Sequence, residues 1–130
     1  MKTTIRSIGA ALAGLWGALP LLVQILVILQ AIDVASGLLS AWYNGTVSST
    51  VSFRGMAKKV LCLALVGGAH VIERGFAFDI PLGAAAAGFY CVHEIISIAE
   101  NAARTGLPLP EQMMRALQKL QGSQSAKPPA

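Results

Sequence analysis

The side chain whose position most limits the chemistry of this chain is Asp33. It stands near the middle of an apolar stretch that runs from Pro20 to Trp42. An acid near the centre of a membrane helix costs about 2.5–3.5 kcal/mol on insertion scales, and such a residue normally faces protein or water. Asp33 is therefore predicted to meet a partner, a water molecule or a proton, as the acids of ion pathways and of contacts between membrane helices do.

Asp33 is predicted to belong to a polar stripe on its helix. At about 100° per residue, its polar and small neighbours fall within an arc of roughly 120°, and Leu, Ile and Val occupy the remaining face. A second stripe of small and polar residues is predicted between Gly83 and Asn101. Two such helices can close a wet interface, so we expect a pore-lining or oligomerisation surface made of Gln30, Asp33, Ser36, Gly37, Ser40, Glu94, Ser97 and Asn101. The alternative is that His93 and Glu94 are solvated residues at the headgroup level.

Catalytic and metal-binding patterns are poor. Cys91 and His93 would point about 160° apart on a helix, so they cannot meet as a thiol and its base. Cys62 and Cys91 lie in apolar stretches without the paired spacing of a zinc site, and we interpret them as buried, inert thiols. The sequence contains no phosphate-binding Gly-rich loop, paired His residues or Ser-centred elbow. We therefore expect a protein that is not an enzyme and that uses no cofactor or metal.

The composition is typical of a membrane protein. Of the 130 residues, 55% are hydrophobic and 12% are charged, and the mean hydropathy is +0.63. An ordinary soluble domain carries about 25% charged residues. The net charge of +4 could suggest a nucleic-acid partner, but the basic residues flank the apolar stretches and form no stripe with interleaved aromatics. We expect the lipid membrane, and not nucleic acid, to be the partner.

The apolar stretches predict an all-α fold, that of a small multi-span membrane protein with about three transmembrane helices. The spans are expected at about Pro20–Trp42, Met56–Ile72 and Ile80–Ile96. A polar loop rich in Ser and Thr is expected over Thr46–Phe53.

The two ends of the chain are predicted to contain shorter helices. The segment Ile5–Ala18 is too short to span a membrane alone, so we expect an interfacial or re-entrant helix, or a helix packed against another copy. Pro20 is expected to open the next helix. The segment Glu111–Leu120 fits a short amphipathic helix. We expect a single membrane domain over residues 1–121, followed by a disordered polar tail over residues 122–130.

The charges at the ends of the spans predict an orientation. Arg54, Lys58 and Lys59 are expected to form a basic loop at the membrane surface that sets orientation and binds anionic lipid. Placing this loop in the cytoplasm also places the C-terminus there and leaves the acidic Glu73–Asp79 loop outside. Lys2 and Arg6 then lie on the disfavoured side, unless the N-terminal helix dips back or adds a crossing.

Small residues spaced four apart let helix backbones approach closely and so favour lateral self-association. The pairs are Ala10 and Gly14, Ala31 and Ala35, Gly37 and Ala41, Gly83 and Ala87, and Ala84 and Gly88. Together with the polar stripes, they predict a homo-oligomer.

Three motifs in a fixed order carry a resemblance to a known family. The first is D-V-A-S-G over residues 33–37, and the second is S-F-R-G-M-A-K-K over residues 52–59. The third is E-I-I-S-I-A-E-N over residues 94–101, continued by G-L-P-L-P over residues 106–110. Over about residues 20–120 the chain resembles the toxin secretion/phage lysis holin family. The long apolar N-terminus and the group His70, Glu73 and Arg74 depart from the common pattern of that family.

The resemblance implies a protein that accumulates in the bacterial cytoplasmic membrane and oligomerises there. It further implies a timed lesion through which an endolysin, that is a cell-wall hydrolase, or another protein cargo leaves the cell. A small cation channel or transporter subunit is an alternative, with Asp33 and Glu94 coordinating or relaying cations. An antiholin that regulates a lytic homologue is another.

Overall fold

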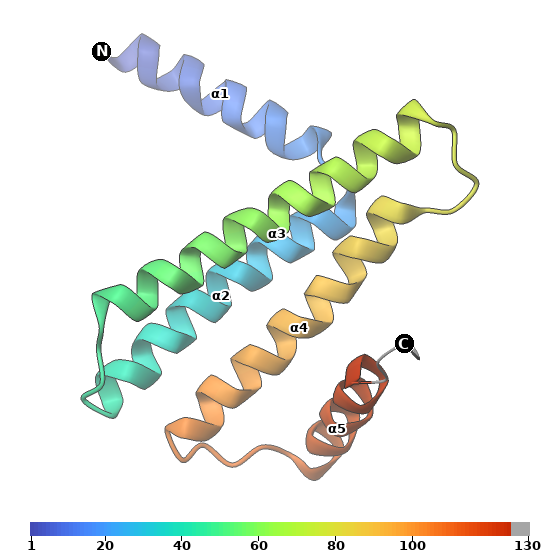
Figure 1. The fold of residues 1–130 in the computed structure, drawn as a ribbon. Coiled ribbons are helices and arrows are strands. Elements are labelled where there is room, and N and C mark those ends of the chain that lie inside the picture. Colours follow the sequence, from blue (N-terminus) through green and yellow to red (C-terminus); the bar gives the residue numbers. More distant parts are fainter. Residues whose placement is uncertain (126–130) are drawn as a thin grey trace.

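The computed structural model describes residues 1–125, and within this range the chain is all-α (Figure 1). The five helices are α1 (Lys2–Ala18), α2 (Leu21–Tyr43), α3 (Ser49–Gly75), α4 (Leu82–Arg104) and α5 (Glu111–Ser125). Three of them, α2, α3 and α4, are long and apolar enough to cross a membrane. The predicted fold class and the number of spans are therefore confirmed.

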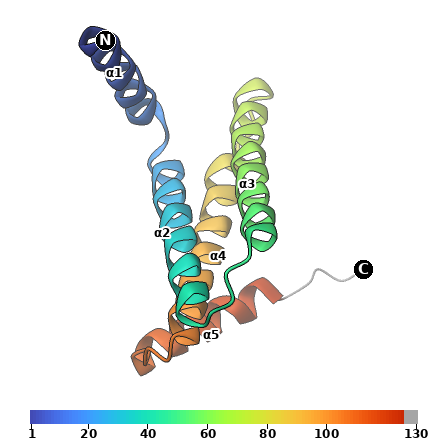
Figure 2. The same ribbon diagram turned by 90° about the vertical axis from the view of Figure 1, so that its left-hand side faces the viewer.

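The three long helices form a bundle in which α4 is the central element. α4 packs along both α2 and α3, whereas α2 and α3 touch each other at few places. α2 and α4 run in the same direction and α3 runs in the opposite one (Figures 1 and 2). As a result, the end of α2, the start of α3 and the end of α4 lie at the same end of the bundle.

The N-terminal helix α1 extends away from the bundle, as Figures 1 and 2 show, and none of its residues is buried. The break between α1 and α2 lies at Pro20, which has no N–H to donate to the carbonyl of Trp16. The side chain of Gln24 compensates, because its Nε2 donates to the carbonyls of Trp16 at 2.8 Å and of Leu19 at 3.3 Å. The expected helix before Pro20 and the expected start of the next helix there are both present.

The helix α3 begins earlier than the sequence pattern indicated. The expected polar loop over Thr46–Phe53 is wrong from Ser49 onward, because those residues form the first turns of a helix. Ser48 caps this helix by accepting a hydrogen bond from the N–H of Val51, and the hydroxyl of Ser52 donates to the carbonyl of Ser48 at 3.0 Å. The Ser and Thr residues that suggested a loop are thus compatible with a helix start.

The helix α4 also extends beyond its expected end at Ile96, and continues to Arg104. Its last two turns remain helical because Ser97 and Asn101 face the bundle and not the solvent, in keeping with the low exposure of Asn101. Gly106, with a φ of +81°, ends the helical course, since a positive φ strains residues other than glycine.

The C-terminal helix α5 is the predicted amphipathic helix, with Leu117 and Leu120 on its less exposed side. It crosses the end of the bundle transversely in Figure 2. The structure continues this helix through Ser125, whereas the sequence indicated a tail from residue 122. The rest of the predicted tail, residues 126–130, lies outside the described residues.

One end of the bundle is closed by a tight contact between α3 and α4. The N–H of Gly83 donates to Glu73 Oε2 at 2.9 Å, and a Cβ at Gly83 would overlap the imidazole of His70. Next to this contact, Leu26, Val66, Ala87 and Cys91 form a buried apolar cluster. Large apolar side chains on the outside of all three helices remain exposed, which fits a lipid surrounding.

Candidate functional site

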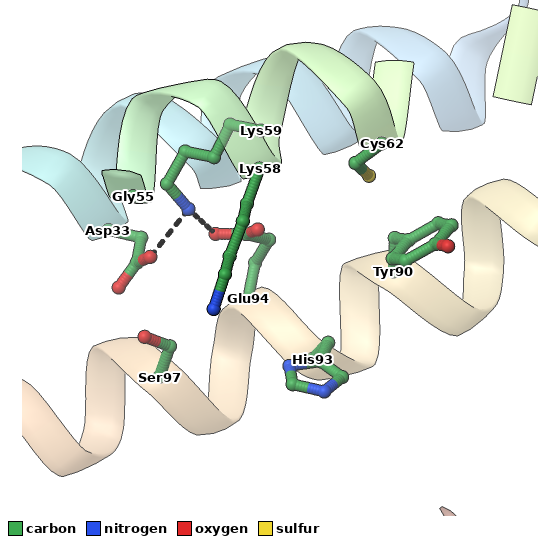
Figure 3. Close-up of a pocket in the computed structure, with 9 residues that line it drawn as sticks. All are labelled: Asp33, Gly55, Lys58, Lys59, Cys62, Tyr90, His93, Glu94 and Ser97. Atoms are coloured by element: carbon green, nitrogen blue, oxygen red, sulfur yellow. Dashed lines mark hydrogen bonds and ion pairs between the residues drawn. The ribbon is translucent and has the colours of Figure 1, made fainter. Parts of the chain in front are cut away.

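Three charged side chains from three different helices meet inside the bundle. Lys59 of α3 donates to Asp33 Oδ2 of α2 at 2.6 Å and to Glu94 Oε2 of α4 at 2.5 Å, as drawn in Figure 3. Their side chains are only 11–15% exposed. We call Asp33, Lys59 and Glu94 the charged cluster. It contains two acids and one base, so it carries an excess negative charge when all three groups are ionised.

The charged cluster lies near the middle of the helices that could span the membrane. At 1.5 Å per residue, Asp33, Lys59 and Glu94 each lie about 15 Å from the same end of the bundle. Because the hydrocarbon layer is about 30 Å thick, this places the charges close to its centre. There, each charge needs a partner within the bundle, since lipid offers none.

The identity of the inward-facing lysine follows from helix geometry. Lys58 and Lys59 are adjacent, so their side chains leave the helix about 100° apart. Lys59 points between α2 and α4, while Lys58 is exposed. Lys59 therefore makes the ion pairs, while Lys58 lines the adjoining pocket, as Figure 3 shows.

A second connection joins α2 and α4 through the amide of Asn101. Its Nδ2 donates to Asp33 Oδ1 at 2.9 Å, to Ser36 Oγ at 3.0 Å and to the carbonyl of Asp33 at 3.3 Å. A Cβ at Gly37 would lie 3.4 Å from the same nitrogen, so the small residue leaves room for the amide. Asp33 is thus held by α3 through one carboxylate oxygen and by α4 through the other.

The remaining residues of the predicted polar surface extend the same interior face. Gln30 is buried and donates to the carbonyl of Lys59 at 3.3 Å, and Ser40 is buried nearer the end of α2. Ser97 lines the cavities beside the charged cluster. The structure therefore brings all eight residues of the predicted surface to the interior of one chain, where the contacts join α2 to its own α3 and α4.

Two cavities flank the charged cluster. One, of about 330 Å³, lies mainly between α3 and α4 and is the pocket shown in Figure 3. The other, of about 390 Å³, extends from the cluster to the ends of α2 and α4. Asp33, Gly55, Lys59 and Ser97 line both of them. We call this part of the bundle, from the charged cluster to Arg104, the polar half, and the part from the cluster to Gly83 the apolar half.

The structure corrects the expected basic surface loop. Arg54, Lys58 and Lys59 all lie within α3, and Lys59 is turned inward. Sequence reasoning missed the role of Lys59 because it started the helix at Met56, which placed this lysine within reach of the headgroups. The cap at Ser48 was the signal that could have moved the helix start and placed Lys59 deep in the span.

The interior chemistry is that of ion pairs and hydrogen bonds. No group of three or more His, Cys, Asp or Glu residues within the described chain is arranged to hold a metal ion. Cys91 is buried, and its thiol donates a hydrogen bond to the carbonyl of Leu22 at 3.8 Å. The charged cluster can hold its helices together, exchange a proton or accept water from the adjoining cavities.

The chain is similar to proteins of several bacteria and of a bacteriophage. The chain is 37% identical to an uncharacterized protein of Halalkalibacterium halodurans, covering 96% of both chains. It is 29% identical to a protein of Bacillus phage phi105 named as a probable holin, covering 85% of this chain and 81% of that one. It is also 29% identical to an uncharacterized protein from the nagH 3' region of Clostridium perfringens, covering 92% of both.

No solved structure matches the chain significantly. The model of the bacteriophage holin family, by contrast, matches residues 10–122, which include all three long helices, the charged cluster and most of α5. The chain is a multi-pass membrane protein of the bacteriophage holin family.

Proposed function

We propose that this chain is a holin that accumulates in the bacterial cytoplasmic membrane, oligomerises, and at a set time opens a lesion through which a cell-wall hydrolase or another protein cargo passes. Membership of the holin family supports the role. The observation that carries the proposal is the charged cluster, which stores polar surface in the middle of the bundle where lipid does not reach it. A lesion needs such a surface, since its rim must face water.

The resting state of the proposed mechanism is the single bundle. The side chains of Asp33, Lys59, Glu94 and Asn101 are paired within the chain, and large apolar side chains are exposed on its outside, so individual copies can accumulate in lipid. α3 is the helix that can leave most easily, because it touches α2 at few places and is held in the polar half mainly through Lys59.

The open state follows when many copies crowd together. Displacement of α3 breaks the charged cluster and exposes the inner faces of α2 and α4. Neighbouring copies then cover part of these faces, and the rest line a water-filled rim. Asp33, Ser36, Gly37, Glu94 and Asn101 are the residues that we expect at the rim or between copies.

The proposed orientation places the C-terminus in the cytoplasm. Arg54 is exposed near the start of α3, Lys58 is exposed about one turn further along it, and Arg104 ends α4 at the same end of the bundle as Arg54. Basic residues favour the cytoplasmic side. Replacement of Arg54 and Lys58 by Gln is expected to change which loops a protease reaches in intact cells, and unaltered cleavage would contradict this assignment.

The proposal is tested by expressing the chain alone in bacteria that also contain a cytoplasmic cell-wall hydrolase without an export signal. We expect the membrane potential to collapse abruptly after a delay, together with release of the hydrolase. Ion flux without release of folded protein would instead indicate a channel. An absence of leakage, combined with delayed lysis by a lytic homologue, would indicate an antiholin. Either result would overturn the proposed lesion.

A further inference from the structure

The cavity of about 390 Å³ forms a groove between α2 and α3 in the polar half. α4 closes its floor with Ser97 and Asn101, while its walls carry the apolar side chains of Leu38, Val51 and Met56. These three side chains are 47%, 70% and 48% exposed, so the groove opens outward. Its volume falls within the range of about 300–1,000 Å³ that is usual for small-molecule sites.

The outer end of the groove is polar and positively charged. It is lined by Arg104, Asn44, Thr46, Ser48 and Ser52. The amide nitrogen of Asn44 is already engaged, because it donates to the carbonyls of Ser40 at 2.8 Å and of Arg104 at 3.2 Å. The one carboxylate in the described lining is that of Asp33, which lies at the inner end and is paired with Lys59. Arg104 forms no ion pair within residues 1–125. The outer end therefore has hydroxyl groups and a positive charge that no acid in the lining balances.

The position of these donors matches a lipid headgroup. Asn44, Thr46 and Ser48 belong to the turn between α2 and α3, and Arg104 ends α4, so all of them lie where the spans leave the hydrocarbon layer. The exposed apolar walls begin directly inside this level. A molecule that fits must carry an anion at one end and a hydrocarbon chain at the other.

We propose that this groove binds an anionic phospholipid, with its phosphate beside Arg104 and the hydroxyls of Thr46 and Ser48 and an acyl chain between Leu38 and Met56. A second copy is a poorer occupant by charge. Near the same level of a copy inserted in the same direction, the long helices carry Arg54 and Arg104 against Glu100, so basic side chains would face a basic groove.

The binding of one lipid by the closed bundle goes beyond the lesion proposed above and does not require a lesion. A protein that opens lesions without retaining lipid would contradict this inference alone. A protein that retains lipid without opening a lesion would contradict the proposed function alone.

The test uses the full chain, purified in detergent, stripped of lipid and then given phosphatidylglycerol, phosphatidylcholine or inorganic phosphate as separate probes. Native mass spectrometry counts the lipids that each chain retains. We expect retention of one phosphatidylglycerol, with affinity at least roughly tenfold higher than for phosphatidylcholine, because charge-assisted hydrogen bonds favour the anion. Inorganic phosphate is expected not to displace it, since the acyl chain adds apolar contact.

Two variants and one control locate the site. Arg104→Gln removes the charge at the outer end and is expected to weaken retention of phosphatidylglycerol roughly tenfold. Gly55→Leu keeps all charges but places a side chain in the groove, where a Cβ meets nothing within 4 Å, and is expected to weaken retention similarly. Arg54→Gln removes a charge at the same membrane level outside the groove, and is expected to leave retention within about twofold.

An equal loss of phosphatidylglycerol retention in the Arg54 and Arg104 variants would overturn the proposal, because it would indicate that the lipid is attracted to any basic surface. Equal retention of phosphatidylcholine, or displacement of phosphatidylglycerol by inorganic phosphate, would also overturn it. Circular dichroism checks that each variant is folded. If Gly55→Leu loses its helical signal, Gly55→Ala tests the groove with a smaller side chain. The Arg104 and Arg54 variants then decide whether the charge in the groove is required.

Discussion

The polar half and the apolar half of the bundle are held together by different forces. In the apolar half, Leu26, Val66 and Ala87 are almost completely buried, and Gly83 lets α4 approach His70 closely. In the polar half, ion pairs and the amide of Asn101 bridge helices that leave one cavity between them, and the second cavity reaches from the charged cluster toward Cys62 and Tyr90. Close packing favours one arrangement, whereas a few polar contacts around cavities can be exchanged for contacts with water or another copy. In the proposed mechanism, the polar half is therefore the part that we expect to open.

The largest effect is expected from Lys59→Met, which removes the base and leaves two acids buried near each other. Removal of one partner from a buried ion pair costs about 3–5 kcal/mol. We expect a folded bundle of lower stability and earlier onset of leakage at matched protein levels. Chemical unfolding in detergent and a dye-leak assay measure the two effects.

The matched control for this variant is Lys58→Met, which changes the adjacent exposed lysine. Its unfolding free energy should stay within about 0.5 kcal/mol of the parent chain. Similar losses in the Lys58 and Lys59 variants would contradict the role of the charged cluster. The triple variant Asp33→Asn, Lys59→Met, Glu94→Gln removes all three charges and should regain part of the lost stability.

Gly83→Ala in the apolar half is expected to lower the free energy of unfolding by about 1–3 kcal/mol. The new methyl group overlaps His70, and overpacking has costs of this size. Gly88→Ala is the control, since a Cβ there meets nothing within 4 Å. It should be neutral or slightly stabilising because alanine favours helix. The added change His70→Ala should rescue the Gly83 variant, and a failure to rescue would refute the steric explanation. Thermal unfolding measures all three.

Asn101→Ala tests how much the hydrogen bonds of the polar half contribute to stability. It removes the donor that joins α4 to Asp33 and Ser36, and we expect a loss of about 1–2 kcal/mol together with earlier leakage. Glu100→Ala, at the neighbouring exposed position, should leave unfolding and leakage nearly unchanged. A loss of stability without any change in the onset of leakage would separate the amide from the opening step.

The smallest change in stability is expected from Asp33→Asn, about 1 kcal/mol or less, because the amide keeps its size and Glu94 still pairs with Lys59. The onset of leakage should nevertheless shift, since the cluster loses its excess negative charge. Asp33→Leu, which can form no hydrogen bond, should shift the onset further. Unchanged onset of leakage and lysis in both variants would remove Asp33 from the mechanism.

Several parts of the fold were accessible from local patterns. The span of α2 was predicted within a residue at each end, since its apolar length and Pro20 mark both its extent and its start. The start of α3 and the end of α4 were not predicted. The segments 49–52 and 97–104 have the composition of loops, and their helical state depends on contacts with other helices. Polar residues near the end of a helix have the same composition whether they face water or a bundle interior.

The candidate site could be predicted from the sequence only in part. Asp33 stood out because a charge in an apolar stretch needs a partner, but nothing near it in the sequence identified that partner as Lys59. Lys59 looked like a headgroup residue, and Glu94 and Asn101 lie more than sixty positions away from Asp33. Side-chain periodicity assigns a residue to a face of its own helix and does not say which helix that face meets.

The sequence by itself determined that this chain is a helical membrane protein with three spans and polar stripes on two of them, because hydrophobic length and helical period are local properties. Only the tertiary structure decided that these stripes close on each other within one chain, with Lys59 between Asp33 and Glu94. That pairing depends on the packing of α4 against both α2 and α3, and contacts between distant helices are set by shape and charge in three dimensions.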